Sequence, residues 1–341
     1  MAVALGNRVL TTTQDEYLPF LVDTILDSNV FATRQLGRAK KWVGERMRFP
    51  IKVSKNSTGT SFSGFDTFST SATNNRLLLT YSPAFYQITV ALPLDELSVN
   101  ATDAKVLDLA SVEFATAAQD MADDVGTLFY ADGTGNNSKD FLGLAAIIDD
   151  GGSVADIGGQ SRSANTSLQS TVTASGGTLT LALMQTLYSD VSSGSQKPTL
   201  GLAPEAVNDF YEQLLNPQER IVKDVPMMKR GLEGGTGFVG LFFKGFPILA
   251  DEKATAQTLF FVNEDFVDWY ALPMALTEPI KFKSVDIRGN DYSSVLGLGF
   301  SWSGWIKPSN QAAVVGHIYL GGDLLTSNPK RHGRLTGITA S

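Results

Sequence analysis

One glycine-rich loop contains the residue types that could hold a phosphate group. Residues 133–140 read GTGNNSKD. The phosphate-binding loop reads G-x-x-x-x-G-K-[ST], with backbone N–H groups around the phosphates and the last hydroxyl on Mg²⁺. Ser138 stands where that motif needs its second glycine, and Asp140 stands where it needs the hydroxyl. The loop also follows a predicted helix, whereas the motif follows a strand. We therefore predict no nucleotide site here.

Serine and histidine are also poorly placed for catalysis or metal binding. The Gly–Ser contexts at 59–64 and 299–304 put the second glycine one residue too late for a nucleophile elbow. His317 and His332 are the only histidines and there is no cysteine, which excludes a three-histidine zinc site and a cysteine nucleophile. The apolar alternation around His317 predicts a packed residue. The basic, glycine-flanked context of His332 predicts an exposed one.

Adjacent carboxylates occur at Asp123-Asp124 and at Asp149-Asp150. Side chains at neighbouring positions seldom point at one spot, so we interpret these pairs as solvated turns or salt-bridge partners. Without a general base, an activated nucleophile or a cluster of metal ligands, the sequence favours a protein that is not an enzyme. It predicts no catalytic residue, no metal site and no cofactor.

The composition narrows the class of protein further. The 341 residues include 27 Lys and Arg against 35 Asp and Glu, for a net charge of −8. A dedicated nucleic-acid binder usually has a basic footprint, so this acidic balance argues against one. No apolar run reaches the roughly 18 residues of a membrane-spanning helix, and the N-terminus does not read as a secretory signal. Charged residues make up 18%, against about 25% in ordinary domains. The sequence predicts a soluble, cytosolic chain whose surface suits close packing against other proteins.

Residues 1–47 are expected to form an arm that begins with a helix. Thr13 and Glu16 have the spacing of a capping box. A basic stretch follows, and it is the most concentrated positive segment of the chain. It contains Arg34, Arg38, Lys40, Lys41, Arg46 and Arg48. These residues are either salt-bridged or solvated within the chain, or they lie on an acidic neighbouring subunit.

Residues 48–97 form a long segment of low charge, rich in Ser and Thr. Alternating apolar residues at 77–81 and 88–92 predict two strands, and Ser82-Pro83 separates them. Phe62, Phe65 and Phe68 are widely spaced within it. An isolated two-stranded hairpin is marginally stable, and an exposed strand edge invites pairing. We expect this segment to contact another molecule.

The strongest periodic signal predicts one long helix over residues 102–131. Apolar residues recur every seven positions, with Leu107, Phe114, Met121 and Leu128 on one stripe. About 30 residues at 1.5 Å each would span roughly 45 Å. A homotypic coiled coil is the alternative, which the strand-rich surroundings disfavour.

The remaining chain divides into a compact α/β region and a late set of antiparallel strands. Helical spacing over 178–191 predicts a helix, and residues 198–215 predict a strand followed by a helix that starts near Pro204. Residues 226–240, which include Met227 and Met228, are rich in Met and Gly and are expected to be a mobile loop. Residues 277–320 alternate as antiparallel strands do, and a short basic tail closes the chain.

The order of these parts resembles the major capsid proteins of tailed bacteriophages, which share the Hong Kong 97 fold. Three stretches resemble the family as well. They are residues 130–152 (YADGTGNNSKDFLGLAAIIDDGG), 161–191 (SRSANTSLQSTVTASGGTLTLALMQTLYSDV) and 298–320 (LGFSWSGWIKPSNQAAVVGHIYL). The resemblance covers nearly the whole chain and lies in the architecture and these stretches, because the family has no short invariant motif.

The resemblance implies an α+β chain with the parts of that fold. They would be an N-terminal arm (1–47), an extended β-hairpin loop (48–97), a peripheral domain with its long spine helix (98–141), an axial α/β domain (142–272), the peripheral strands (273–308), and a return to the axial domain with the C-terminal tail (309–341). Copies of the chain would assemble as pentamers and hexamers into an icosahedral head around double-stranded DNA. The candidate subunit-interface residues are Arg34, Arg38, Lys40, Lys41, Phe62, Phe65, Phe68, Met227 and Met228.

The resemblance also implies partners and a location. The chain would contact many copies of itself, and portal, scaffold and decoration proteins are possible further partners. Packaged DNA would be contacted weakly and without sequence specificity, and no membrane is involved. The protein would reside in the virion after assembly in the bacterial cytoplasm.

The resemblance also bears on the scaffold and on crosslinks. Met1 lies close to the arm, so a scaffold is expected to be a separate protein. Some members of the family form a covalent crosslink between a loop Lys and an Asn of a neighbouring subunit. Lys52 and Lys55 lie in a suitable segment, but the sequence shows no evident Asn acceptor, so no crosslink is predicted.

Three other classes of function remain open from the sequence. An encapsulin, which is a bacterial compartment shell of the same fold, would share these parts but package enzymes rather than DNA. A secreted or tail-associated carbohydrate-binding protein would account for the Ser/Thr/Gly-rich strands but not for the long helix. An enzyme would need a site that the residue patterns do not provide.

Overall fold

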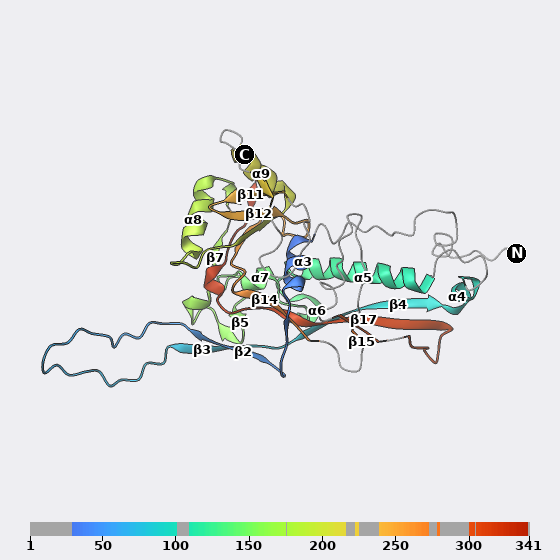
Figure 1. Ribbon diagram of the computed structural model, residues 1–341, viewed down its shortest axis with the longest axis horizontal. Helices are drawn as coiled ribbons and strands as arrows, with labels where there is room; N and C mark the ends of the chain where they lie inside the picture. The colour runs from blue at the N-terminus through green and yellow to red at the C-terminus, as the bar shows by residue number, and fades with distance from the viewer. Residues whose placement is uncertain are drawn as a thin grey trace.

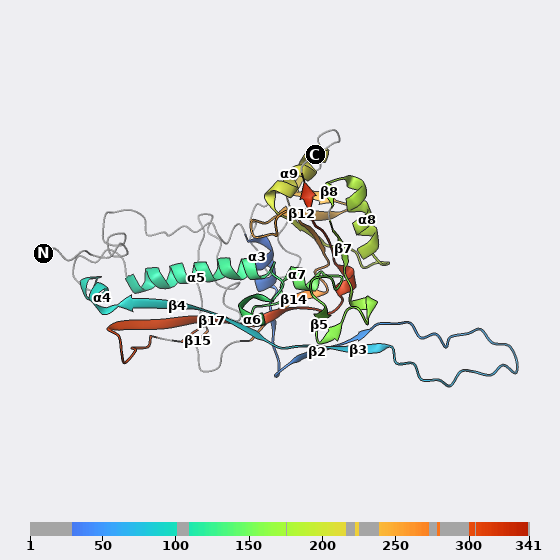
Figure 2. The ribbon, with the colours of Figure 1, turned by 180° about the vertical axis from the view of Figure 1, so that it is seen from behind.

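The computed structural model describes most of the chain, and its elements form an elongated molecule (Figure 1). The described residues are 29–100, 109–174, 176–215, 222–224, 239–272, 278–279, 300–303 and 305–339. A hairpin projects from one end, helix α4 (Leu94–Asn100) lies at the other, and a sheet covered by helices rises between them (Figures 1 and 2). The predicted capping box at Thr13 and Glu16, together with Met227 and Met228, lies outside the described residues.

A six-stranded sheet runs along the length of the molecule and is organised around one long strand, β17 (Ala313–Thr326). The other strands are β1 (Lys40–Lys41), β4 (Ala84–Pro93), β14 (Val267–Ala271), β15 (Glu278–Pro279) and β16 (Phe300–Trp302). Strand β4 pairs antiparallel with β17 over ten residues, from Ala84 opposite Gly322 to Pro93 opposite Ala313. Strands β14 and β16 also pair antiparallel with β17. The antiparallel strands predicted within 277–320 are therefore confirmed where they are described.

Helix α5 (Leu109–Leu128) lies along one face of this sheet and corresponds to the predicted long helix (Figure 1). Its 20 described residues span about 30 Å at 1.5 Å each. Of the predicted seven-residue stripe, Met121 is fully buried, Leu128 is half-buried and Leu107 lies outside the described residues. Val125, one turn after Met121, is also fully buried. The helix ends at Leu128, just before Phe129 and Tyr130 turn into the core.

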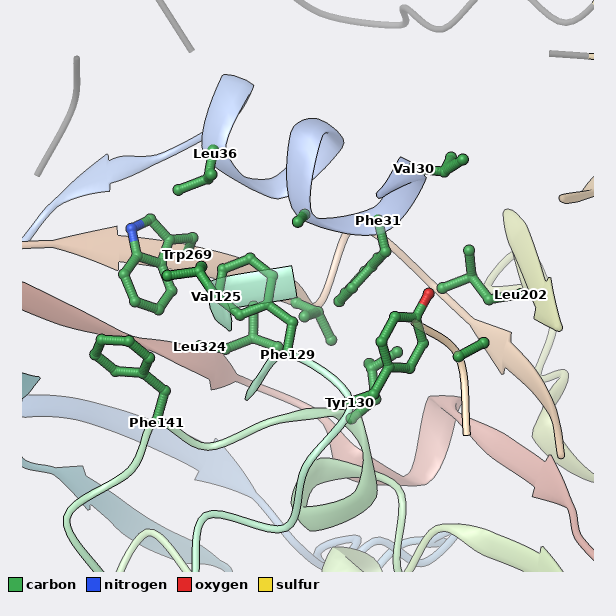
Figure 3. Close-up of a cluster of buried hydrophobic side chains, with 14 of the residues drawn as sticks. Val30, Phe31, Leu36, Val125, Phe129, Tyr130, Phe141, Leu202, Trp269 and Leu324 are labelled. Atoms are coloured by element: carbon green, nitrogen blue, oxygen red, sulfur yellow. The ribbon is translucent and has the colours of Figure 1, made fainter. Parts of the chain in front are cut away.

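The main core lies where helix α3 (Val30–Gly37) and the end of α5 meet both sheets. Phe31 contacts Phe129 and Tyr130, and Trp269 packs between Phe129 and Phe141 with ring centroids 5.0 Å apart in each pair (Figure 3). These aromatic contacts join segments that are about 100 residues or more apart in the sequence.

A seven-stranded mixed sheet forms the second layer, in the order β10-β11-β12-β9-β13-β18-β7. Its strands are β7 (Thr171–Thr173), β9 (Leu200–Ala203), β10 (Val222–Asp224), β11 (Val239–Phe243), β12 (Phe246–Ala250), β13 (Leu259–Val262) and β18 (Gly333–Leu335). Helices α8 (Leu181–Val191) and α9 (Glu205–Leu215) cover one face, and the main core covers the other. Every residue of β9 and β13 is buried, because both faces of these strands are covered. Both predicted helices and the strand before α9 are confirmed.

The projecting hairpin consists of β2 (Met47–Lys52), β3 (Arg76–Tyr81) and the tip segment 53–75 between them. The strand predicted over 88–92 is confirmed as part of β4, but β4 pairs with β17 and not with a hairpin strand. Strand β14 likewise pairs with β17, so the predicted α/β region of 142–272 supplies strands to both sheets. Small elements complete the described chain. They are α6 (Gly135–Ser138), α7 (Leu144–Ile147), β5 (Asp156–Ile157), β6 (Gln160–Ser161), η1 (Thr166–Leu168), β8 (Gly177–Thr178), η2 (Pro329–Arg331) and β19 (Ile338–Thr339).

The C-terminal tail is not an exposed basic extension. After β17 the chain passes through η2 and enters the seven-stranded sheet as β18, between β13 and β7. His332, which we predicted to be exposed, is completely buried, so that prediction is wrong. Its Nδ1 accepts a hydrogen bond from the backbone N–H of Asn263 at 3.2 Å. The glycine and basic residues around His332 resemble a loop in sequence, yet Gly333 and Leu335 are buried strand residues.

Candidate functional site

The tip of the hairpin carries three exposed phenylalanines. Phe62, Phe65 and Phe68 are 67%, 106% and 61% exposed. The rings of Phe62 and Phe68 meet edge to face with centroids 5.2 Å apart. Fully burying one phenylalanine stabilises a protein or complex by about 1.5–3 kcal/mol. The tip projects away from the rest of the chain (Figure 1), so these rings stay unburied in a single copy. Exposed apolar clusters of this kind are typical of surfaces that contact another molecule.

Local hydrogen bonds give the tip segment a defined shape. Asn56 Oδ1 accepts hydrogen bonds from the backbone N–H and the hydroxyl of Thr58, and from the hydroxyl of Thr73 across the loop at 3.0 Å. The backbone N–H of Ser63 donates to Asp66 Oδ2 at 2.8 Å. The two arms of the tip are thus held together where no strand ladder joins them.

The root of the hairpin is anchored in a small core of its own. Leu79 and Tyr81 of β3 are buried there together with Trp42, Ile157, Leu168 and Leu325. The Thr80 backbone N–H donates to the carbonyl of Gly158, and the Tyr81 hydroxyl donates to the carbonyl of Thr326. Burial raises the pKa of the Tyr81 phenol well above its usual value, so it stays a neutral donor. The hairpin therefore projects from a fixed base.

Three cations of the basic segment, which begins within α3, pair with carboxylates of the same chain. Arg34 makes two hydrogen bonds to the Glu264 carboxylate, at 2.9 and 2.8 Å. Arg38 lies 3.1 Å from Glu264 and 3.6 Å from Asp268, and Lys40 pairs with Asp268. The sequence left two interpretations of the basic residues, salt bridging or solvation within the chain and contact with an acidic neighbouring subunit. Arg34, Arg38 and Lys40 form salt bridges within the chain. Lys41 is exposed, and its role at an interface stays a prediction.

The outer face of the six-stranded sheet, opposite α5, presents uncharged side chains. Phe85 is half exposed, and Gln87 and Thr89 are exposed. Thr89 Oγ1 lies 3.0 Å from His317 Nδ1 across the β4–β17 pair. His317 is half-buried, so it is less enclosed than the predicted packed residue.

Asp251 is a buried carboxylate that the sequence analysis missed. Its Oδ2 accepts hydrogen bonds from the Phe31 backbone N–H and the Tyr130 hydroxyl, both at 2.9 Å, and its Oδ1 accepts one from the Lys253 N–H at 3.0 Å. Burial raises the pKa of Asp251, and these hydrogen bonds oppose the rise. The side chain joins α3, the end of α5 and the end of β12.

A second polar cluster is formed by Asp149 and two arginines. Asp149 is 1% exposed and pairs with Arg334 at 2.7 Å, while its Oδ2 accepts hydrogen bonds from three backbone N–H groups of residues 151–154. Arg162 is also buried and donates to the carbonyls of Ala146, Ile147, Asp149 and Leu168. Desolvation lowers the pKa of Arg162. The prediction of a salt-bridge partner is confirmed for Asp149, whereas a solvated turn is excluded.

The other acidic pair is also engaged within the chain. Asp123 pairs with Lys253 at 2.8 Å, and Asp124 accepts a hydrogen bond from the Tyr86 hydroxyl at 2.7 Å. Among the residues that the structure describes, no group of three or more His, Cys, Asp or Glu side chains could hold a metal ion. No helix in the described ranges is long and apolar enough to cross a membrane.

Comparison with known proteins identifies the fold. No family model matches the sequence, and neither does any curated protein. Among solved structures, the capsid asymmetric unit of cyanophage A-1(L) matches with a TM-score of 0.68 and 14% identity over 96% of both chains. The capsid of a native GTA particle matches with a TM-score of 0.59 and 11% identity over 96% of this chain and 94% of that one.

An encapsulin has the same fold. The holo-SrpI encapsulin complex from Synechococcus elongatus PCC 7942 matches with a TM-score of 0.61 and 10% identity, over 97% of this chain and 95% of that one. The chain thus has the Hong Kong 97-like fold of tailed-phage major capsid proteins, as the order of its parts predicted. These neighbours are two capsids and an encapsulin, and at 10–14% identity they share a fold of mixed helices and sheets with this chain.

Proposed function

We propose that this chain is the major capsid protein of a tailed phage, which assembles as pentamers and hexamers into an icosahedral head around double-stranded DNA. One observation carries the proposal. A hairpin fixed at its base holds three exposed phenylalanines away from both cores of its own chain. A single copy cannot bury them, and a shell of many copies can.

The physics of a closed shell suits such a chain. Each subunit is held by several neighbours at once, so individually weak contacts add up to a stable particle. In this proposal residues 1–47 are the N-terminal arm, the hairpin is the extended loop, α5 is the spine helix of the peripheral domain, and the seven-stranded sheet belongs to the axial domain. Lys41 and the segment with Met227 and Met228 are further candidate contacts. Portal, scaffold and decoration proteins would be the partners in the host cytoplasm, and the virion the final location.

The net charge of −8 favours weak contact with the packaged DNA. An acidic lining repels the phosphate backbone, so DNA would slide during filling and ejection. The electrostatic potential of the inner surface of an assembled particle tests this step, and a strongly positive lining would contradict it.

Imaging of the purified full-length protein tests the proposal as a whole. Closed icosahedral particles with five-fold and six-fold clusters of subunits are the expected result. A protein that stays monomeric at high concentration would overturn the assignment.

An encapsulin is the second candidate, favoured by the match to the SrpI complex over nearly the whole of both chains. The contents of particles purified from the native source distinguish the two. Double-stranded DNA of uniform length supports the phage head, whereas a packaged enzyme and no DNA supports the compartment.

A further inference from the structure

A cavity of about 560 Å³ lies at the root of the hairpin. Its wall comes from three separate parts of the chain. They are residues 80–85 at the turn from β3 to β4, residues 133–142 in the loop after α5, and the glycine turn between β5 and β6. The volume lies within the range of about 300–1,000 Å³ that is usual for small-molecule sites.

Asp323 of β17 lies in the wall of this cavity and is only 4% exposed. Its Oδ1 accepts hydrogen bonds from the backbone N–H groups of Leu142 at 2.7 Å and Leu324 at 2.9 Å. Among the described residues, the hydrogen bonds to this carboxylate all go to Oδ1. Desolvation raises the pKa of the Asp323 carboxyl well above its usual value. Burial of the Asp323 side chain disfavours its charged form, and a cation beside the carboxylate would offset that cost.

The rest of the wall is suited to a cation with an apolar stem. Asp140 is a second carboxylate in the wall, and the half-exposed Phe85 is an aromatic residue of the wall, of the type that attracts cations. Pro83 and Leu142 supply apolar surface. Lys139 is the only cation in the wall, and within the described part of the chain it forms no ion pair with either aspartate.

We propose that this cavity binds an organic cation, an ammonium or guanidinium group on an alkyl stem, with Asp323 Oδ2 as its hydrogen-bond acceptor and Asp140 as a second acidic partner. The stem packs on Pro83 and Leu142 in the way that Lys and Arg side chains cover apolar surface. The cation is supplied either by a free amine or by a basic side chain of a second copy of the chain. Binding to the unassembled chain does not depend on shell formation, so this inference stands apart from the proposed function.

Two probes of equal length test the charge. n-Butylamine and 1-butanol are titrated into the unassembled full-length protein, and binding is followed by calorimetry and by NMR shifts of residues around the cavity. Butylamine is expected to bind and butanol is not. Asp323→Asn keeps an Oδ1 acceptor for Leu142 but removes the charge, and should weaken butylamine binding at least tenfold. Asp140→Asn should weaken it several-fold.

Asp190→Asn is the matched control, because Asp190 is an exposed residue of α8 outside the cavity. This variant should bind butylamine with the affinity of the wild type. If Asp323→Asn fails to fold, the partly exposed Asp140 still provides the test. The proposal would be overturned if butylamine did not bind, or if butanol bound as tightly as butylamine. It would also be overturned if Asp140→Asn, and Asp323→Asn where that variant folds, bound butylamine with wild-type affinity.

Assembled particles distinguish the two sources of the cation. If butylamine binds particles as well as it binds the unassembled chain, the cavity is open in the shell and takes a free amine. If butylamine binds only the unassembled chain, a basic side chain of a neighbouring copy occupies the cavity in the shell.

Discussion

The Tyr130 hydroxyl donates a 2.9 Å hydrogen bond to Asp251 Oδ2, across 121 residues of sequence. Tyr130 follows the last turn of α5, and Asp251 follows β12 of the seven-stranded sheet. The same carboxylate oxygen accepts a hydrogen bond from the backbone N–H of Phe31 at the start of α3. One buried side chain therefore fixes how the long helix, the N-terminal helix and the second sheet meet.

Tyr130→Phe tests the strength of this junction. The substitution keeps the ring in the core but removes one of the two donors to Oδ2, and a hydrogen bond to a charged group contributes about 1.5–3 kcal/mol. We expect the free energy of unfolding, measured by urea titration of the unassembled chain, to fall by roughly that amount. Tyr188→Phe is the control, because Tyr188 is only partly buried on α8 and its hydroxyl makes no hydrogen bond within the described residues. Equal losses in the two variants would contradict the junction.

The buried imidazole of His332 predicts a pH dependence of stability. Desolvation lowers its pKa to about 3, whereas an unfolded histidine titrates near 6.5. Below about pH 6.5 the unfolded chain binds a proton that the native chain does not, so the stabilising contribution of neutral His332 is complete above that pH and is lost as the pH falls towards 3. One proton corresponds to about 1.4 kcal/mol per pH unit.

A comparison of the wild type with His332→Asn measures this effect. Between about pH 6 and pH 4, the free energy of unfolding of the wild type should fall more steeply than that of the variant, by up to about 1.4 kcal/mol per pH unit. His317→Asn is the control, because His317 is half-buried on the outer sheet face. Parallel pH profiles for the wild type and His332→Asn would show that His332 is protonated in the native state.

Local patterns predicted what depends on neighbouring residues in the chain. The helical spacing of α8 and the alternation in β3 and β4 depend on short-range periodicity, and each was found where it was expected. The partner of β4 could not be predicted, because β17 lies more than 200 residues further along. His332 was misjudged for the same reason, because its burial depends on distant groups such as the Asn263 N–H. Arg162 was missed because its partners are backbone carbonyls of residues 146–168, which carry no signal in the side-chain sequence.

The root of the hairpin should be sensitive to one methyl group. Gly158 has φ +55°, and a Cβ there would lie 2.8 Å from the Cβ of Leu79. Gly158→Ala therefore combines backbone strain with a clash in the small core, and we expect a loss of about 2–4 kcal/mol. Gly159→Ala is a close control, because Gly159 has φ +71° but open space around it. It should lose only about 1 kcal/mol. Thermal unfolding and hydrogen exchange of residues 77–81 would compare the two.

The ion pairs of the basic segment predict a contrast between an enclosed and an exposed pair. Glu264→Gln removes the charge that Arg34 and Arg38 share, at side-chain exposures of 10–19%, and should cost about 1–3 kcal/mol. Glu45→Gln removes the partner of Arg46 in a pair that is 54% and 89% exposed, and should cost less than about 0.5 kcal/mol. Urea titration at low and high salt measures both. If Glu264→Gln left the unfolding free energy unchanged, the ion pairs of Arg34 and Arg38 with Glu264 would not stabilise the fold.

The exposed phenylalanines of the hairpin tip should act on assembly and not on folding. In the triple variant Phe62→Ser/Phe65→Ser/Phe68→Ser, the exposed rings contribute little to the unassembled chain, so its unfolding free energy should change by less than about 1 kcal/mol. If neighbouring copies bury the rings, each lost ring costs about 1.5–3 kcal/mol per contact, and every 1.4 kcal/mol is a tenfold change. The critical concentration for assembly, followed by light scattering, should therefore rise at least tenfold.

The double variant Thr67→Ala/Thr70→Ala is the control for this experiment. It changes exposed residues of the same tip and should assemble as the wild type does. Normal assembly of the triple variant would exclude the tip as a subunit contact, whereas loss of folding in that variant would show that the tip contributes to the monomer itself.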